Sequence, residues 1–238
     1  MKHTAAVLAI STLGLAGCSS PPPVAASSPP PRAFAESFAV EPQDWASTGA
    51  NPYFILEPGY FLEFKGKEHG KPVHLTITVL DETRQVDGVE TRVVEERESE
   101  GSELTEVSRN YFAFSKTDGG VYYFGEDVDE YEDGKVAKHG GSWLSGVNGA
   151  RFGLMMPAAP AVGARYYQEL APHVAMDRAE VVSVTETFET PAGTFTDCLK
   201  TEETTPLEKG REAKLYAPGV GLIKDGAFRL VRYGARGK

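Results

Sequence analysis

The chain has 238 residues, of which 41% are hydrophobic and 24% are charged, so it is long enough to bury one large core or two small ones. Its formal net charge of -10 at pH 7 means that the average surface repels phosphate groups. We therefore exclude nucleic acid as a partner.

Residues 1–17 have the plan of a secretory signal peptide. Lys2 and His3 give a short positive region, and residues 5–16 form an apolar stretch. A helix that spans a bilayer needs roughly 20 apolar residues. The stretch is shorter than that, which disfavours a permanent transmembrane helix.

The end of this stretch, Leu15-Ala16-Gly17-Cys18, resembles the lipobox of bacterial lipoproteins. The resemblance implies that the Cys18 sulfur receives a diacylglyceryl group and that the peptide is cut before Cys18. Two or three acyl chains would anchor the protein stably to a membrane. Ser19 replaces the Asp that commonly marks inner-membrane retention, so the resemblance favours an outer-membrane lipoprotein that faces the periplasm. The alternative is a buried Cys18 in a hydrophobic helix.

The next segment, SSPPPVAASSPPPR at 19–32, has too few apolar side chains to offset the entropy of ordering, and its prolines favour polyproline II. We interpret residues 18–50 as a lipidated cysteine followed by a Pro/Ser-rich tether, and residues 51–238 as the folded β domain. Residues 33–50 leave two alternatives open, a short helix or a segment that packs against that domain.

The pattern after Asn51 is that of β-strands. Runs of β-forming residues, many alternating with period two, lie at 60–64, 73–82, 89–96, 110–115, 121–128, 164–170, 179–188, 193–203 and 213–218. Pairs such as Asp87-Gly88 and Asp133-Gly134 between them are hairpin signals. The sequence predicts a mainly β fold of curved antiparallel sheets with little helix.

Two parts of the chain resemble each other at an offset of about 104 residues. Residues 79–98 match residues 183–203, with Gly88 opposite Gly193, and Tyr111 matches Tyr216 further along. We interpret the domain as two copies of one β module, at about 51–150 and 151–232. The alternative is a chance likeness between hairpins of similar composition.

The second cysteine, Cys198, has no partner for an internal disulfide once Cys18 carries lipid. Its counterpart in the first copy is Val93, which favours a small buried hydrophobic residue over a catalytic thiol.

The most acidic stretch is GEDVDEYEDGK, in which Asp127, Asp129 and Asp133 are weak candidates for calcium ligands. The spacing fails the EF-hand pattern, and an extended strand holds same-face residues roughly 7 Å apart. A solvated strand that runs into a turn is the favoured interpretation, and we expect no metal and no cofactor.

No catalytic signature for a metalloprotease, a nucleophile elbow, a P-loop or a dinucleotide fold is present in the sequence. We therefore expect no enzyme. The alternative is an envelope hydrolase whose carboxylate site the sequence does not reveal.

The segment between the two copies, SGVNGARFGLMMPAAPAVGARYY, carries Phe152, Leu154, Met155 and Met156 among glycines and prolines that argue against regular structure. These side chains need burial. One alternative is that they plug a core shared by the modules. The other is that they line the mouth of an apolar cavity and contact a hydrophobic ligand.

The motifs NPYFILEPGY, TPAGTF and YAPGVGLIK together resemble a group of uncharacterised bacterial secreted proteins and lipoproteins. The last two are also similar, at the level of fold, to periplasmic domains related to the LolA/LolB lipoprotein carriers. The first resemblance carries no agreed function, and the second is an analogy of fold, so we transfer no site residues from either group. We expect a cell-envelope protein with a binding or structural role, whose partners are the membrane, through its anchor, and a hydrophobic ligand or an envelope protein.

Overall fold

The computed structural model describes residues 33–236, so the predicted signal peptide, Cys18 and the Pro/Ser-rich segment to residue 32 lie outside the described residues. The chain divides into two units, 1–30 and 31–238, and the description concerns the second. Apart from one 3-10 turn, η1 (Pro42–Asp44), the regular elements of the described residues are β-strands. These are β1 (Trp45–Ala46), β2 (Gly49–Asn51), β3 (Phe54–Leu56), β4 (Tyr60–Glu68), β5 (Lys71–Val86), β6 (Val89–Glu100), β7 (Glu103–Ser115), β8 (Val121–Glu132), β9 (Lys135–Lys138), β10 (Trp143–Leu144), β11 (Arg151–Met156), β12 (Arg165–Tyr167), β13 (Glu169–Leu170), β14 (Arg178–Thr190), β15 (Gly193–Thr204), β16 (Glu212–Ala217), β17 (Gly221–Asp225) and β18 (Phe228–Ala235).

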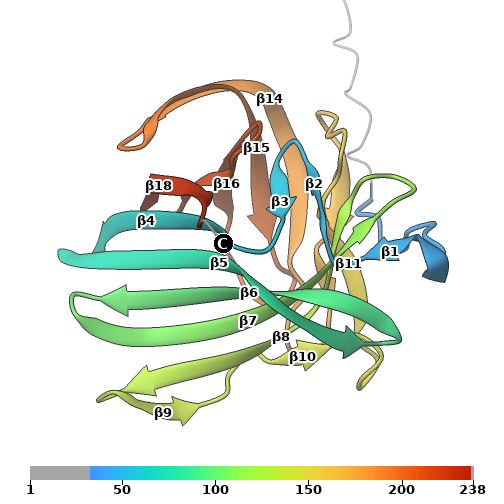
Figure 1. Cartoon of the computed structure of the whole chain (residues 1–238), viewed down its shortest axis with the longest axis horizontal. Coiled ribbons are helices and arrows are strands. Elements are labelled where there is room, and N and C mark those ends of the chain that lie inside the picture. The colour runs from blue at the N-terminus through green and yellow to red at the C-terminus, as the bar shows by residue number, and fades with distance from the viewer. Residues whose placement is uncertain (1–32, 237–238) are drawn as a thin grey trace, which may run out of the picture. The chain divides into compact units, whose positions relative to one another are not determined.

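All but two of these strands belong to one 16-stranded antiparallel sheet, whose main path runs β12-β14-β15-β16-β17-β18-β4-β5-β6-β7-β8-β11-β13. Figure 1 shows β4 to β8 side by side across the front, β14 to β16 behind them, and the separate β2–β3 hairpin between the two walls. The prediction of a mainly β fold with curved antiparallel sheets and little helix is confirmed.

The two ends of the sheet meet where β11 passes β12. A Cβ atom at Gly153 on β11 would overlap the backbone of Gln168 and lie 2.6 Å from the Tyr167 carbonyl oxygen. Only glycine allows the backbones to approach this closely.

The predicted hairpin turns are present. Asp87 and Gly88, at the tip of the β5–β6 hairpin, have φ angles of 51° and 78°. Two successive positive φ angles match the right-handed twist of the flanking strands, and Asp-Gly adopts them at low cost. Asp133 and Gly134 repeat this geometry between β8 and β9.

The two halves of the sheet share one strand order, β4-β5-β6-β7 and β12-β14-β15-β16. Gly59 and Gly163, which the repeat aligns, have φ angles of 86° and 82° and each donates its amide to a valine carbonyl at 2.8 Å. The aligned Tyr111 and Tyr216 are both buried. The interpretation of the domain as two copies of one module stays a prediction.

The core consists of three groups of packed side chains, and Cys198 belongs to the one under β4, β16 and β18. Its side chain is completely buried, and burial raises the pKa of its thiol. The interpretation of Cys198 as a small buried hydrophobic residue is confirmed.

Residues 33–50 pack against the sheet, so ordered structure starts before Asn51. Ala35 forms a parallel bridge to Tyr166 on the edge of β12, and β1 pairs with β7. The Trp45 ring meets Tyr122 and Phe124 edge-on at centroid distances of 5.1 and 5.2 Å. Of the two alternatives for this segment, the described residues adopt the packed one, because its aromatic side chains have apolar area to bury.

The close approach at Gly153 predicts a stability defect. We expect Gly153→Ala to lower the free energy of unfolding by about 1–3 kcal/mol, because a methyl group there forces the backbones of β11 and β12 apart. Urea unfolding measures this change. Gly210→Ala, where an added Cβ meets open space, is the control. Equal midpoints for the two variants would show that the contact is not tight.

Candidate functional site

The β2–β3 hairpin, residues 49–56, covers the inner side of the sheet, and we call it the flap. It is held at its turn by few hydrogen bonds. The Asn51 side-chain amide donates to the carbonyls of Gly119 and Met156, each at 3.2 Å, and the Gly219 amide donates to the Pro52 carbonyl at 2.7 Å. The flap pairs with no strand of the large sheet.

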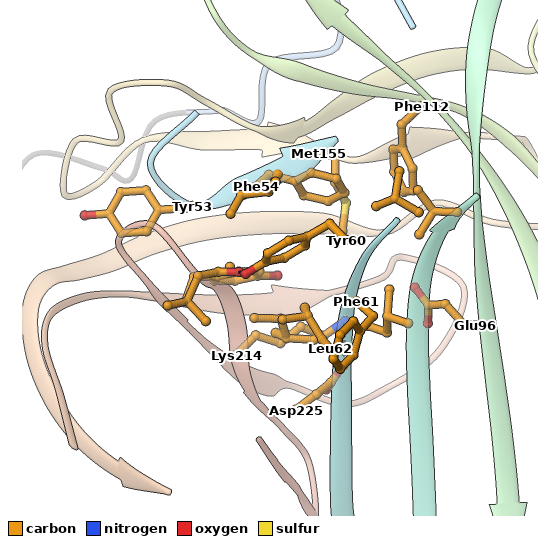
Figure 2. Close-up of a pocket in the computed structure, with 18 residues that line it drawn as sticks. Tyr53, Phe54, Tyr60, Phe61, Leu62, Glu96, Phe112, Met155, Lys214 and Asp225 are labelled. Carbon is orange, nitrogen blue, oxygen red and sulfur yellow. Dashed lines mark hydrogen bonds and ion pairs between the residues drawn. The ribbon is translucent and has the colours of Figure 1, made fainter. Parts of the chain in front are cut away.

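Beneath the flap lies a hollow of about 680 Å3, including the part open to solvent. Strands β4, β5, β6, β7, β16 and β17 contribute to its wall, and we call it the apolar hollow because aromatic and aliphatic side chains dominate its lining. Figure 2 shows these side chains converging below the flap residues Tyr53 and Phe54. The lining comprises Tyr53, Phe54, Ile55, Tyr60, Phe61, Leu62, Ile77, Val79, Val94, Phe112, Met155, Tyr216, Val220, Gly221 and Leu222, with three charged residues, Glu96, Lys214 and Asp225.

The three charged residues form the floor of the apolar hollow. Lys214 Nζ lies 3.1 Å from a Glu203 oxygen and 3.2 Å from an Asp225 oxygen, and its side chain is 21% exposed. Burial lowers the pKa of Lys214, but Glu203 and Asp225 raise it by more, so the ammonium stays charged. Burial raises the pKa of Glu96 to about 7, with Asp225 adding to the shift and Lys214 opposing it.

A second space, which we call the acidic hollow, continues from this floor between β6, β7 and β16. It shares Glu96 and Asp225 with the apolar hollow and is lined further by Glu98, Glu106 and Glu212. Deeper along the same inner face, burial raises the pKa of Glu126 to about 7 and that of Glu169 well above its usual range. The interior is therefore apolar under the flap and acidic beyond it.

The structure separates the four residues predicted to line a cavity. Met155 lines the apolar hollow. Phe152 stacks on Phe124 at 4.9 Å, Leu154 packs against the core, and Met156 is 1% exposed within it. The expectation that this segment lacks regular structure is wrong, because residues 151–156 form β11 and pair with β8 and β13.

The three calcium candidates also lie apart. Asp127 accepts a hydrogen bond from the Tyr111 hydroxyl at 2.7 Å and pairs with Arg84. Asp129 pairs with His139 at 2.7 Å, and Asp133 occupies the β8–β9 turn. No group of metal-ligating side chains that could hold an ion occurs in residues 33–236.

Sequence reasoning missed the flap and the charged floor. A signal for the floor is present, since Val94, Glu96 and Glu98 alternate along β6 and therefore share one face of the strand. Glu212, Lys214 and Tyr216 alternate in the same way on β16.

No family model matches the chain, and no curated protein matches it. Among solved structures, a candidate lipoprotein from Parabacteroides distasonis aligns with 75% of this chain and 96% of its own, at 13% identity and a TM-score of 0.35. A likeness this distant carries no argument about function, so the family resemblance drawn from the motifs stays a prediction. Within residues 33–236, no helix is long and apolar enough to cross a membrane.

The raised pKa of Glu96 predicts a pH dependence of stability. The folded protein holds this proton more tightly than the unfolded chain, so its contribution is complete below pH 4.5 and is lost as the pH rises through about 7. In Glu96→Gln, the decrease of the free energy of unfolding over that pH range should be smaller than in the wild type by up to about 3 kcal/mol. Urea unfolding at several pH values measures it, with exposed Glu132→Gln as the control. Parallel pH profiles for the wild type and Glu96→Gln would contradict the assignment.

Proposed function

We propose that this protein is a lipid-anchored component of the bacterial cell envelope that binds a hydrophobic ligand without transforming it. The observation that carries the proposal is the apolar hollow under a flap that pairs with no strand of the large sheet. Small-molecule sites are mostly apolar with a few polar groups, and the lining of this hollow has that character.

The flap provides a route into the hollow. It is fastened to the rest of the fold by Asn51, by the Pro52 carbonyl, and by the Tyr53 hydroxyl, which donates to the Asp197 carbonyl at 3.3 Å. Breaking these bonds leaves the large sheet intact, because none of them belongs to its ladder. Opening therefore breaks no hydrogen bond of the large sheet, and its cost lies in exposing Leu56, which is completely buried, and Phe54, which packs on Phe112.

The anchor supports the cellular setting of the proposal. The Leu15-Ala16-Gly17-Cys18 sequence and Ser19 favour an acylated Cys18 at the outer membrane, on its periplasmic side. The partners are then the membrane, through the acyl chains, and the hydrophobic ligand; an envelope protein could deliver or receive that ligand.

A second candidate function is an envelope hydrolase, and one observation favours it. Glu96 and Glu126 both have pKa values raised to about 7, where a carboxyl group can act as a general acid or base. Release of product from chromogenic esters or glycosides would favour this activity over simple binding.

Binding in the apolar hollow predicts that N-phenyl-1-naphthylamine, whose fluorescence rises in apolar surroundings, binds saturably. Met155→Asp should weaken its affinity at least about tenfold, because the variant places a charge in the lining. Val136→Asp also replaces an apolar side chain with aspartate, but on the exposed strand β9, and should leave the affinity for the dye unchanged. If the wild type shows no saturable binding, the proposed function is wrong.

The anchor predicts a change of fractionation. Cys18→Ser removes the acylated sulfur, so the variant should leave the membrane pellet while the wild type stays in it. Western blotting of pelleted membranes and supernatant measures the distribution, and Cys198→Ser serves as the control for loss of a thiol. A Cys18→Ser protein that remains in the pellet after removal of its leader would contradict the anchor.

A further inference from the structure

The apolar and acidic hollows together form one amphipathic interior. They share Glu96 and Asp225, so a ligand under the flap has its far end beside these two carboxylates. In Figure 2 the flap residues lie in the upper part of the view, and Lys214 and Asp225 lie in the lower part. The space therefore suits a molecule with an apolar part and a polar head.

Acidic side chains dominate the lining of the interior. The basic side chains lining the acidic hollow and the two spaces that adjoin it are, in residues 33–236, Lys214 and Arg211. Lys214 is already held by Glu203 and Asp225, and Arg211 pairs with Glu202. The carboxylates on the same lining are Glu68, Glu96, Glu98, Glu106, Glu126, Glu169, Asp177, Glu203, Glu208, Glu212 and Asp225.

Several of these carboxyl groups lie opposite another carboxyl group in the sheet. Glu98 on β6 and Glu106 on β7 are direct cross-strand partners, and Glu106 is in turn opposite Glu130 on β8. Like charges directly opposite each other destabilise a sheet. Burial, and after it the neighbouring carboxylates, raise the pKa values of Glu98 and Glu106. A cation placed among them would remove this repulsion.

A separate observation points to a missing partner in the apolar hollow. The Tyr216 side chain lines the apolar hollow and is 2% exposed, yet its hydroxyl has no hydrogen-bond partner in the described part of the chain. A buried hydroxyl without a partner is costly, and each such group in a native fold calls for an explanation. Glu203, Lys214 and Asp225 are the charged groups that act on it.

We propose that the ligand is an amphiphile with a cationic, amine-type head group. Its hydrocarbon part occupies the apolar hollow, and its ammonium lies at the floor, where Glu96 and Asp225 attract it, Asp225 being shared with Lys214, and the Tyr216 oxygen accepts a hydrogen bond. Anionic amphiphiles are disfavoured because the carboxyl groups of the two hollows outnumber Lys214, whose ammonium already pairs with Glu203 and Asp225. This inference rests on the proposed function and names the class of molecule that the site selects.

The experiment compares three probes with one hydrocarbon chain and different heads: decylammonium, decanol and decanoate. Each displaces N-phenyl-1-naphthylamine from the Cys18→Ser protein, which carries no acyl chains of its own to occupy the hollow. We expect decylammonium to bind at least about tenfold more tightly than decanol, and decanoate more weakly than decanol.

Two pairs of variants test whether Glu96 and Asp225 cause the preference for decylammonium. Glu96→Gln and Asp225→Asn should each reduce the affinity for decylammonium severalfold and leave that for decanol unchanged, which also shows that the variants fold. Glu132→Gln and Asp133→Asn, the same changes at exposed positions of β8 and its turn, should change neither affinity.

The outcomes separate this inference from the proposed function. Equal affinities for the three probes, or a preference for decylammonium that survives Glu96→Gln and Asp225→Asn, overturn the cationic head group while hydrophobic binding stands. Failure of all three probes to displace a saturably bound dye overturns the head-group inference as well, and absence of saturable dye binding overturns the proposed function itself.

Discussion

The interior of this protein depends on the curvature of one antiparallel sheet. Strand β6 lies five positions from β16 along the order of the sheet, yet Val94 and Tyr216 belong to the same core and line the same hollow. The bending has visible causes, since the register shifts within β5–β6, β7–β8 and three times within β14–β15. Such irregularities bend strands and increase their twist. Without these register shifts, the sheet would not bend enough to bring β6 and β16 to opposite sides of the apolar hollow.

The sequence was sufficient for the class of fold and for many of its hairpins, because alternation and Asp-Gly turns are local properties of the chain. The two stretches that resemble each other lie on β5-β6 and on β14-β15, which occupy corresponding places in the sheet. The hollow could not be predicted in the same way. Glu96 and Asp225 meet only because the sheet closes upon itself, and the curvature that brings them together arises from register shifts that no short window of sequence records. The flap was missed for a similar reason, since Asn51 and Pro52 are fastened by residues far along the chain.

The acidic interior conflicts with the ordinary requirements of stability. A fold selected only for stability would place apolar side chains, or matched pairs of charges, at positions such as 96, 98 and 106. The cost is moderated because burial raises the pKa values of all three carboxyl groups, that of Glu96 to about 7. Departures from the most stable choice of side chain, such as these unmatched acidic groups, occur most often at functional sites, where a ligand supplies the missing interaction.

The order of elements at the start of the described chain has a mechanical consequence. The backbone passes from the bridge at Ala35 through β1 and enters the flap within a few residues. Tension applied from the N-terminal side would therefore load the Trp45 cluster and the pairing of β1 with β7 before it could displace the flap. These contacts therefore isolate the flap from pulling forces that act on the chain from its N-terminal side.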